Sequence, residues 1–402
     1  MRQQLITRLL FLILAFFAAS TFSYAQLTET RIPTATPGVT VIEIEDPIGP
    51  WSVRVVEWDK HVAPNLRLVP TKGAIESSER VAALETTSSM ANRINSSMPV
   101  VAAINADFFN RRGEPVNRMM SAGEWILSHP DNSRRSVLTI DIDQQLWMGP
   151  LSLSTNLCTK SADTYPPCVP LQWNREPGPG TASVLNHWFS DTLKSSETRI
   201  FSISSIAETD LMHATHGTTE FELSVERSED MLIGSAISNW AGTPRLPIGT
   251  RWLAMRGDFW DSVTSRDTLT VETIYNGPLT LPEQIIGGGP MLVQGARMVV
   301  DSMAVVEGVA ESFLTTRHPR SAIGWNADQS IVWLVVVDGR QEHSAGMSLQ
   351  ELSQLFLKLG ASEALNLDGG GSSAIIADGK VLNSPSDPTG ERRVTNALLL
   401  VR

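Results

Sequence analysis

Apolar runs and alternating apolar and polar positions predict many short strands and a few helices in this chain. Residues 39–68 alternate in VTVIEIE and WSVRVVEW, which indicates half-buried strands near the start of the fold. Residues 100–104 and 331–337 are nearly continuous apolar runs, typical of strands covered on both faces. Between residues 200 and 286, short strand-like runs alternate with turn signals, which argues against a regular βαβ sheet.

The clearest helix signal lies in the last third of the chain. Ser348 and Glu351 form a capping-box pattern, apolar residues then recur at helical spacing, and Gly360 ends the run. The other expected elements are a helix over 77–95, strands at 364–367 and 394–401, and a hairpin over 374–382. These elements predict an α+β fold with a mixed β-sheet core, flanking helices and long loop insertions.

The first 25 residues have the pattern of a cleavable secretory leader. Two arginines precede an unbroken apolar run over residues 9–19, and Ser23-Tyr24-Ala25 is a small-x-small cleavage site. The run is too short to span a bilayer comfortably, and no later stretch approaches about 18 consecutive apolar residues. We expect cleavage after Ala25 and a secreted or periplasmic mature chain with no membrane span.

Composition and charge exclude several classes of function. With 42% hydrophobic and 19% charged residues, the chain has the mix of a folded protein and not of a disordered one. The formal net charge of -11 gives no general attraction to nucleic acid. Any phosphate must therefore be bound by a local site, and the oligomeric state stays unknown.

The two cysteines, Cys158 and Cys168, lie in the polar segment CTKSADTYPPC. Because an exported chain meets an oxidising compartment, we expect a local disulfide between them. A metal site would need histidine partners, and His129 and His187 show no ligand-type spacing.

The strongest chemical signal is NLDGGGSS at residues 366–373. Three consecutive glycines indicate a backbone with positive φ or one that a ligand approaches closely, and a tight strand connection is the ordinary alternative. The amides of Gly369, Gly370, Gly371 and Ser372 could converge on an anion. Asp368 beside them must then be paired, protonated, metal-bound or reacting. A second glycine run, 287–289, is expected to be only a bend.

Two further segments carry candidate side chains. In NADFF, Asn105 and Asp107 follow a buried strand, where local turn capping is an alternative role and the two phenylalanines are expected in the core. In RHPRSAIGW, Arg320 enters the next strand and has the planar fork that suits phosphate. Ordinary surface charge is the alternative for Arg320 and for the Arg392-Arg393 pair.

Read in order, these segments resemble the phosphodiester glycosidase family. The match is carried by INADFF, IIGGGPMLVQGAR, RHPRSAIGW, VVVDGRQ, GMSLQELSQLFLKLGA, NLDGGGSSAI, SPSDP and RRVTNAL. The resemblance runs from about residue 39 to the C-terminus, so we expect a single domain over residues 26–402 with a loop-rich elaboration around 150–285. Ala106 stands where the family usually has glycine, and the cysteine segment matches no family motif.

The resemblance implies hydrolysis of the bond between an anomeric carbon and a phosphodiester oxygen, on an envelope or extracellular glycan phosphodiester or another sugar-1-phosphodiester. It implies that Asp368 and Asp107 supply the nucleophile or base and its partner. Arg320 and Arg393, with the amides of residues 369–372, would hold the phosphate. Asn105 and Asp338 would position sugar hydroxyls or a metal. No cofactor is required by the sequence, and a divalent metal is left open.

Two other functions stay open from sequence. One is a non-catalytic exported module that binds an anionic glycan with the same glycines and arginines. The other is a metal-dependent phosphodiesterase that cleaves the P–O bond, with Asp107, Asp338 and Asp368 as oxygen ligands.

Overall fold

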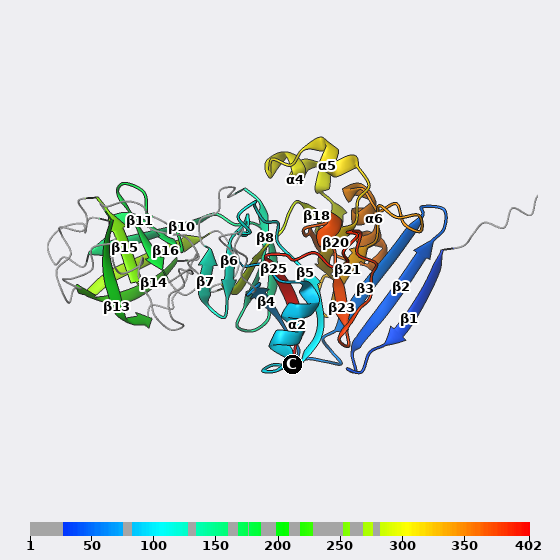
Figure 1. The fold of residues 1–402 in the computed structure, drawn as a ribbon, viewed down its shortest axis with the longest axis horizontal. Helices are drawn as coiled ribbons and strands as arrows, with labels where there is room; N and C mark the ends of the chain where they lie inside the picture. Colours follow the sequence, from blue (N-terminus) through cyan, green and yellow to red (C-terminus); the bar gives the residue numbers. More distant parts are fainter. Residues whose placement is uncertain are drawn as a thin grey trace, which may run out of the picture.

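The computed structural model describes residues 27–74, 83–127, 134–159, 168–175, 177–185, 198–208, 218–227, 252–257, 268–275 and 282–402. The expected leader at residues 1–25 lies outside the described residues. Three sheets and a closed barrel make up the fold, and the barrel lies at one end of the molecule (Figure 1). The fold class is therefore broadly α+β, as expected, but strands clearly dominate over helices.

The eight-stranded sheet forms the centre of the larger part of the molecule. Its strands, in order, are β1 (Thr28–Pro33), β2 (Val39–Asp46), β3 (Trp51–Asp59), β21 (Ile331–Val337), β20 (Arg320–Trp325), β22 (Glu363–Asn366), β18 (Met291–Gln294) and β19 (Arg297–Met298). The apolar run expected to be a covered strand is β21, which pairs antiparallel with β3 and β20. Its position in the middle of the sheet explains why almost every residue in it is apolar.

Two five-stranded sheets and the barrel complete the described strands. One sheet has the order β24 (Lys380–Val381), β23 (Ile375–Ala377), β5 (Val100–Asn105), β25 (Asn396–Val401) and β4 (Arg67–Lys72). The other has the order β7 (Glu124–Leu127), β6 (Met119–Ser121), β17 (Pro282–Gly287), β8 (Ser136–Asp141) and β9 (Leu146–Pro150). The barrel has the order β10 (Leu153–Thr159), β11 (Cys168–Trp173), β12 (Thr181–Leu185), β15 (Trp252–Arg256), β13 (Thr198–Glu208), β14 (Thr218–Arg227) and β16 (Thr268–Tyr275).

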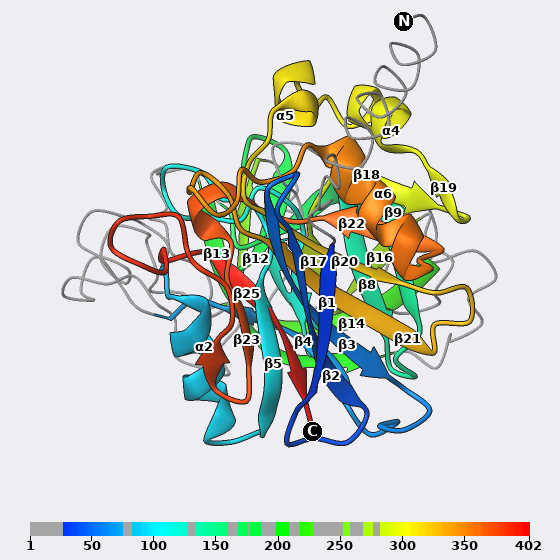
Figure 2. The same ribbon diagram turned by 90° about the vertical axis from the view of Figure 1, so that its right-hand side faces the viewer.

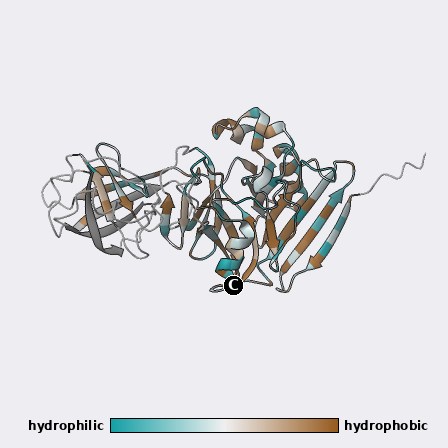
Figure 3. Ribbon diagram, in the orientation of Figure 1, coloured by the Kyte–Doolittle hydropathy of each residue, from teal (hydrophilic) through white to brown (hydrophobic). Residues whose placement is uncertain are grey.

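Helices cover the outer faces of two sheets. The helix α6 (Leu349–Leu359) packs Leu352 and Phe356 onto one face of the eight-stranded sheet, with α4 (Val300–Val306) and α5 (Glu311–Thr315) beside it. The opposite face of that sheet packs against the two five-stranded sheets and forms a hydrophobic core with them. The hydrophobic residues of these strands are brown in Figure 3. The helix α2 (Thr87–Asn95) lies beside β5 and β23, as Figure 2 shows.

Local signals set the ends of both long helices. At α6, the side chain of Ser348 accepts from the Glu351 amide at 3.1 Å and the Glu351 carboxylate accepts from the Ser348 amide at 2.8 Å. Gly360 ends that helix in the left-handed region with φ 92, so the predicted capping box and stop are confirmed. The other helix is shorter than expected: it begins at Thr87 because Thr86 caps it, and residues 75–82 lie outside the described part.

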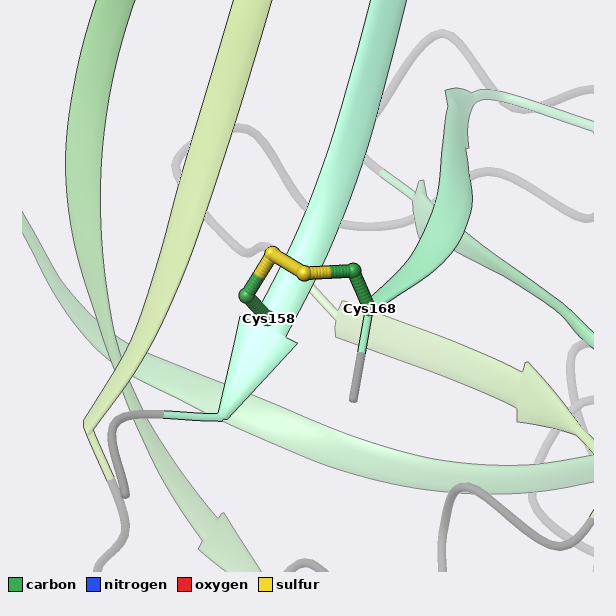
Figure 4. The surroundings of a disulfide bond; sticks show 2 residues. All are labelled: Cys158 and Cys168. Atoms are coloured by element: carbon green, nitrogen blue, oxygen red, sulfur yellow. A yellow bond between two sulfur atoms is a disulfide. The ribbon is translucent and has the colours of Figure 1, made fainter. Parts of the chain in front are cut away.

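The expected disulfide is present: Cys158 and Cys168 are bonded at an S–S distance of 2.04 Å (Figure 4). The two residues are direct partners across the antiparallel pair of β10 and β11. The region expected to be a loop-rich elaboration thus contains the closed barrel, because short barrel strands with frequent turns look like loops in sequence. Among the described residues, no helix has both the length and the apolar character needed to cross a bilayer.

Candidate functional site

Two carboxylates that are far apart in sequence meet where β5 and β22 end. Asp107 follows β5 and Asp368 follows β22, and the backbone amide of Asp368 donates to the carbonyl oxygen of Ala106 at 2.7 Å. The Nδ2 of Asn105 donates to the carbonyl oxygen of Asp368 at 2.6 Å. These bonds tie two strand ends from different sheets together, and the negative charge of Asp368 raises the pKa of Asp107.

Asp107 is the buried member of this pair. Asp107 is 1% exposed. Its two carboxylate oxygens accept hydrogen bonds from the backbone amide and the Nδ2 of Asn117, at 3.0 and 2.6 Å. Burial raises the pKa of Asp107 to about 7, although the Asn117 hydrogen bonds and the positive charge of Arg135 oppose the shift. A substantial share of this group therefore stays protonated near neutral pH.

Asp368 is the more accessible member. Its residue is half-buried, and desolvation raises the pKa of its carboxyl to about 6. The Ser372 hydroxyl, the charge of Arg392 and the Gly369 amide stabilise the ionised form and oppose this rise. The two residues thus differ in exposure, and desolvation raises the pKa of their carboxyl groups to different values, which is the arrangement of an acid and a base that share one site.

Two of the three glycines in the 369–371 loop make room for arginines. Gly370 has φ 63, and a Cβ there would lie 3.2 Å from the Nη2 of Arg340. A Cβ on Gly371 would overlap the Arg392 guanidinium, which donates to the Asp387 carboxylate at 2.7 and 2.9 Å. The guanidinium groups of Arg340 and Arg392 therefore leave little room for a side chain at positions 370 and 371.

The amides of this loop do not form the expected anion nest as a set. The Gly370 amide donates to the carbonyl oxygen of Pro319 at 2.8 Å and the Ser372 amide to that of Gly369 at 3.3 Å. The Gly369 amide stabilises the carboxylate of Asp368 itself. Most of these donors serve the loop and Asp368, so positive charge near the site comes from side chains.

The second glycine run is more than a bend. A Cβ on Gly287 would lie 2.5 Å from the Cγ of Asp107, and one on Gly289 would overlap the carboxylate of Glu307. Glu307 is fully buried and accepts from the Met291 amide at 3.0 Å. Residues 287–289 therefore form the wall behind Asp107, at a distance that only glycine allows.

The two arginines predicted to hold phosphate differ in their surroundings. Arg320 is 1% exposed, and its Nε and Nη2 donate to the carbonyl oxygens of Met347, Phe313 and Thr316 at 2.8 to 2.9 Å. Burial lowers its pKa to about 10, and its Nε and Nη2 hold the chain around α5. Arg393 is exposed, whereas its neighbour Arg392 acts on Asp368.

Asn105 and Asp338 both take part in hydrogen bonds within the fold. The Oδ1 of Asn105 accepts from the Ser321 hydroxyl at 2.7 Å and the Ala374 amide at 3.1 Å, so this side chain holds strands together. Asp338 is 2% exposed and accepts from the Ser384 amide at 2.9 Å in a separate network. Burial raises the pKa of Asp338 as well.

A three-carboxylate metal site of Asp107, Asp338 and Asp368 is therefore not formed by this geometry. Within the ranges that the structure describes, no group of three or more His, Cys, Asp or Glu side chains is arranged to hold a metal ion.

Several residues of the site carry no signal in the sequence. Asn117 fixes Asp107, Arg135 attracts both carboxylates, and Glu307 supports the wall behind them. All three lie outside the quoted motifs, in segments whose pattern is ordinary polar or helical. Arg340 lies within the quoted motif VVVDGRQ. Its closeness to the glycine loop is seen in the structure, where its guanidinium lies beside Gly370.

Comparisons with known proteins cover mainly the C-terminal part. Residues 260–401 match the family model described as phosphodiester glycosidase. The SPbeta prophage-derived uncharacterized protein YomE of Bacillus subtilis is 34% identical over 134 residues, which cover 28% of this chain and 20% of that protein. N-acetylglucosamine-1-phosphodiester alpha-N-acetylglucosaminidase of Bos taurus is 29% identical over 111 residues, covering 26% of this chain and 21% of that protein.

A solved structure shows how far the fold is shared. The crystal structure of a hypothetical protein from Synechocystis has a TM-score of 0.63 at 22% identity, covering 94% of this chain and 68% of that one. This likeness concerns the fold alone, and the chain spans about a fifth of the length of the two relatives it matches in sequence. The likeness to the phosphodiester glycosidase family thus rests on residues 260–401, the part of the chain that the family model matches.

Proposed function

We propose that this protein is an exported hydrolase that cleaves the bond between an anomeric carbon and a phosphodiester oxygen. The observation that carries the proposal is the Asp107–Asp368 pair, one member buried and one accessible, with the pKa of both raised toward neutrality. The family match of residues 260–401 and the leader pattern support it. A glycan phosphodiester outside the cytoplasm is the substrate class we propose.

In this reaction the C–O bond breaks and its electron pair leaves with the phosphate. The oxygen of water ends on the anomeric carbon, and the proton released by water is taken up by the carboxylate pair or by solvent. Asp368 is the group that reaches the sugar, as nucleophile or as base, because it is the accessible member. Asp107 is its buried partner. Phosphate is a good leaving group, so nearby cations can replace strong general-acid assistance.

Hydrolysis in oxygen-18 water tests the proposal directly. The mature protein is incubated with α- and β-linked sugar-1-phosphodiesters, and the products are analysed by mass spectrometry. We expect label in the sugar, since C–O cleavage delivers the water oxygen there. Label in the phosphate would instead establish P–O cleavage by a phosphodiesterase. Binding of every substrate without any release of sugar would establish a non-catalytic glycan-binding module.

The pair predicts a bell-shaped dependence of kcat/KM on pH. The pKa is about 6 for Asp368 and about 7 for Asp107, so the pair holds one proton between these values. Activity should rise as pH passes about 6 and fall as the pair loses its second proton above about 7. Initial rates from about pH 5 to pH 8 at constant ionic strength measure this. A flat profile over that range would contradict the assignment.

Neighbouring arginines provide a matched pair of variants. Arg392 and Arg393 are both exposed, and Arg392 is the one that lies against Gly371 and stabilises the ionised form of Asp368. Because Arg392 stabilises the ionised carboxylate, Arg392→Ala should lower kcat/KM about 10-fold and shift the acidic limb of the pH profile upward. Arg393→Ala should change kcat/KM less than about 3-fold. A larger loss in the Arg393 variant would restore the assignment made from sequence.

A further inference from the structure

Arg135 is a cation that lies among the buried carboxylates of the site. Burial raises the pKa of Asp107, of Asp368 and of Glu307, and the positive charge of Arg135 opposes that rise in each. These three groups come from different parts of the chain and surround the site described above. One guanidinium therefore lies within electrostatic reach of the whole acidic cluster.

The position of this guanidinium is fixed by its surroundings. Its Cζ lies 4.7 Å from the centroid of the Phe108 ring, and that ring meets Phe313 edge to face at 6.0 Å. The next residue along the chain, Ser136, donates its amide and hydroxyl to the Glu307 carboxylate at 3.0 and 2.7 Å. An aromatic face and a buried carboxylate thus hold Arg135 in place before any ligand binds.

Two side-chain nitrogens of Arg135 have no acceptor among the described residues. Its Nε and Nη1 are buried and make no hydrogen bond within the part of the chain that the structure describes. The buried Oδ1 atoms of Asn117 and Asn366 also have no hydrogen-bond partner among the described residues. Leaving a buried charged donor without a partner is costly, so such a group in a native fold needs a ligand or another explanation.

We propose that Arg135 binds the phosphoryl group of the substrate and so sets the preference of the site for an anionic over a neutral leaving group. This inference rests on the proposed function. A guanidinium has only donors, and its bonds to phosphate oxygens are charge-assisted. The acidic cluster would repel an anionic substrate, and Arg135 is the inner cation that offsets this repulsion. Arg392, at the surface, has its Nε and Nη2 bound to Asp387.

The test compares two substrates with the same sugar. One carries a phosphodiester leaving group and the other p-nitrophenol, and both are used with the wild type, Arg135→Gln and Arg135→Lys. Arg134→Gln is the matched control, because Arg134 is the exposed neighbour. Loss of a charged hydrogen bond should lower kcat/KM for the phosphodiester about 10- to 100-fold more than for the aryl glycoside. Arg135→Lys should fall between the wild type and Arg135→Gln, and Arg134→Gln should match the wild type.

Titration with inorganic phosphate gives a second readout that needs no turnover. Phosphate should bind the wild type and Arg134→Gln alike, and about 10- to 100-fold more weakly to Arg135→Gln. Equal loss on both substrates with unchanged phosphate affinity would overturn the proposal and leave Arg135 as a structural cation. If Arg135→Gln does not fold, unchanged discrimination and phosphate affinity in Arg135→Lys overturn it. Failure to cleave either substrate refutes the proposed function, while the titration still decides the role of Arg135.

Discussion

Asp368→Asn is expected to lower the rate of sugar release by about 10²- to 10⁴-fold, the range that loss of a positioned acid, base or nucleophile produces. Asn has nearly the shape of Asp, and its side-chain oxygen can still accept a hydrogen bond. It cannot take up a proton or attack an anomeric carbon. The loss should therefore appear in kcat with little change in thermal unfolding.

The control for this experiment is Asp143→Asn, the same chemical change in an exposed turn after β8. Initial rates on a cleaved sugar-1-phosphodiester and thermal unfolding are measured for both variants. Asp143→Asn should keep the activity of the wild type within about 2-fold, because surface substitutions away from special features change little. Full activity in Asp368→Asn would show that another group carries the chemistry and would leave Asp368 as a loop residue.

Glu307→Ala should lower the free energy of unfolding by about 3 to 5 kcal/mol, as expected when a buried charged partner is removed. The Glu307 carboxylate accepts from the Ser136 amide, the Ser136 hydroxyl and the Met291 amide at 2.7 to 3.0 Å. Removing it leaves these donors unpaired beside a cavity. Because burial raises the pKa of Glu307, the neutral Glu307→Gln should lose less, about 1 to 2 kcal/mol.

Urea or guanidinium unfolding followed by fluorescence measures this loss. The matched control is Glu342→Ala, since Glu342 is exposed in the loop after β21, and it should change the free energy by less than about 0.5 kcal/mol. Equal small effects in both alanine variants would show that the wall behind Asp107 does not depend on Glu307. Reduced activity in a stable Glu307→Gln would indicate that it also positions Arg135 through Ser136.

The candidate site was only partly predictable. Sequence pointed to Asp107 and Asp368, because each follows a buried strand and lies in an unusual loop. It gave no signal for Arg135, and it named Arg393 where the charge of Arg392 acts on Asp368, because adjacent residues in an irregular segment have the same local pattern. The direction in which such a side chain points depends on the turn that carries it.

Sequence alone determined the elements whose signals are local. The strand β21, the capped helix α6 and the hairpin of β23 and β24 lie where their patterns place them, because burial on both faces, capping and tight turns depend on neighbouring residues. Tertiary structure alone decided which loops meet. Asn105 bonds to Asp368 across 263 residues, and Arg320 turns inward to hold carbonyl groups. Such contacts follow from strand register and sheet packing, which no local pattern encodes.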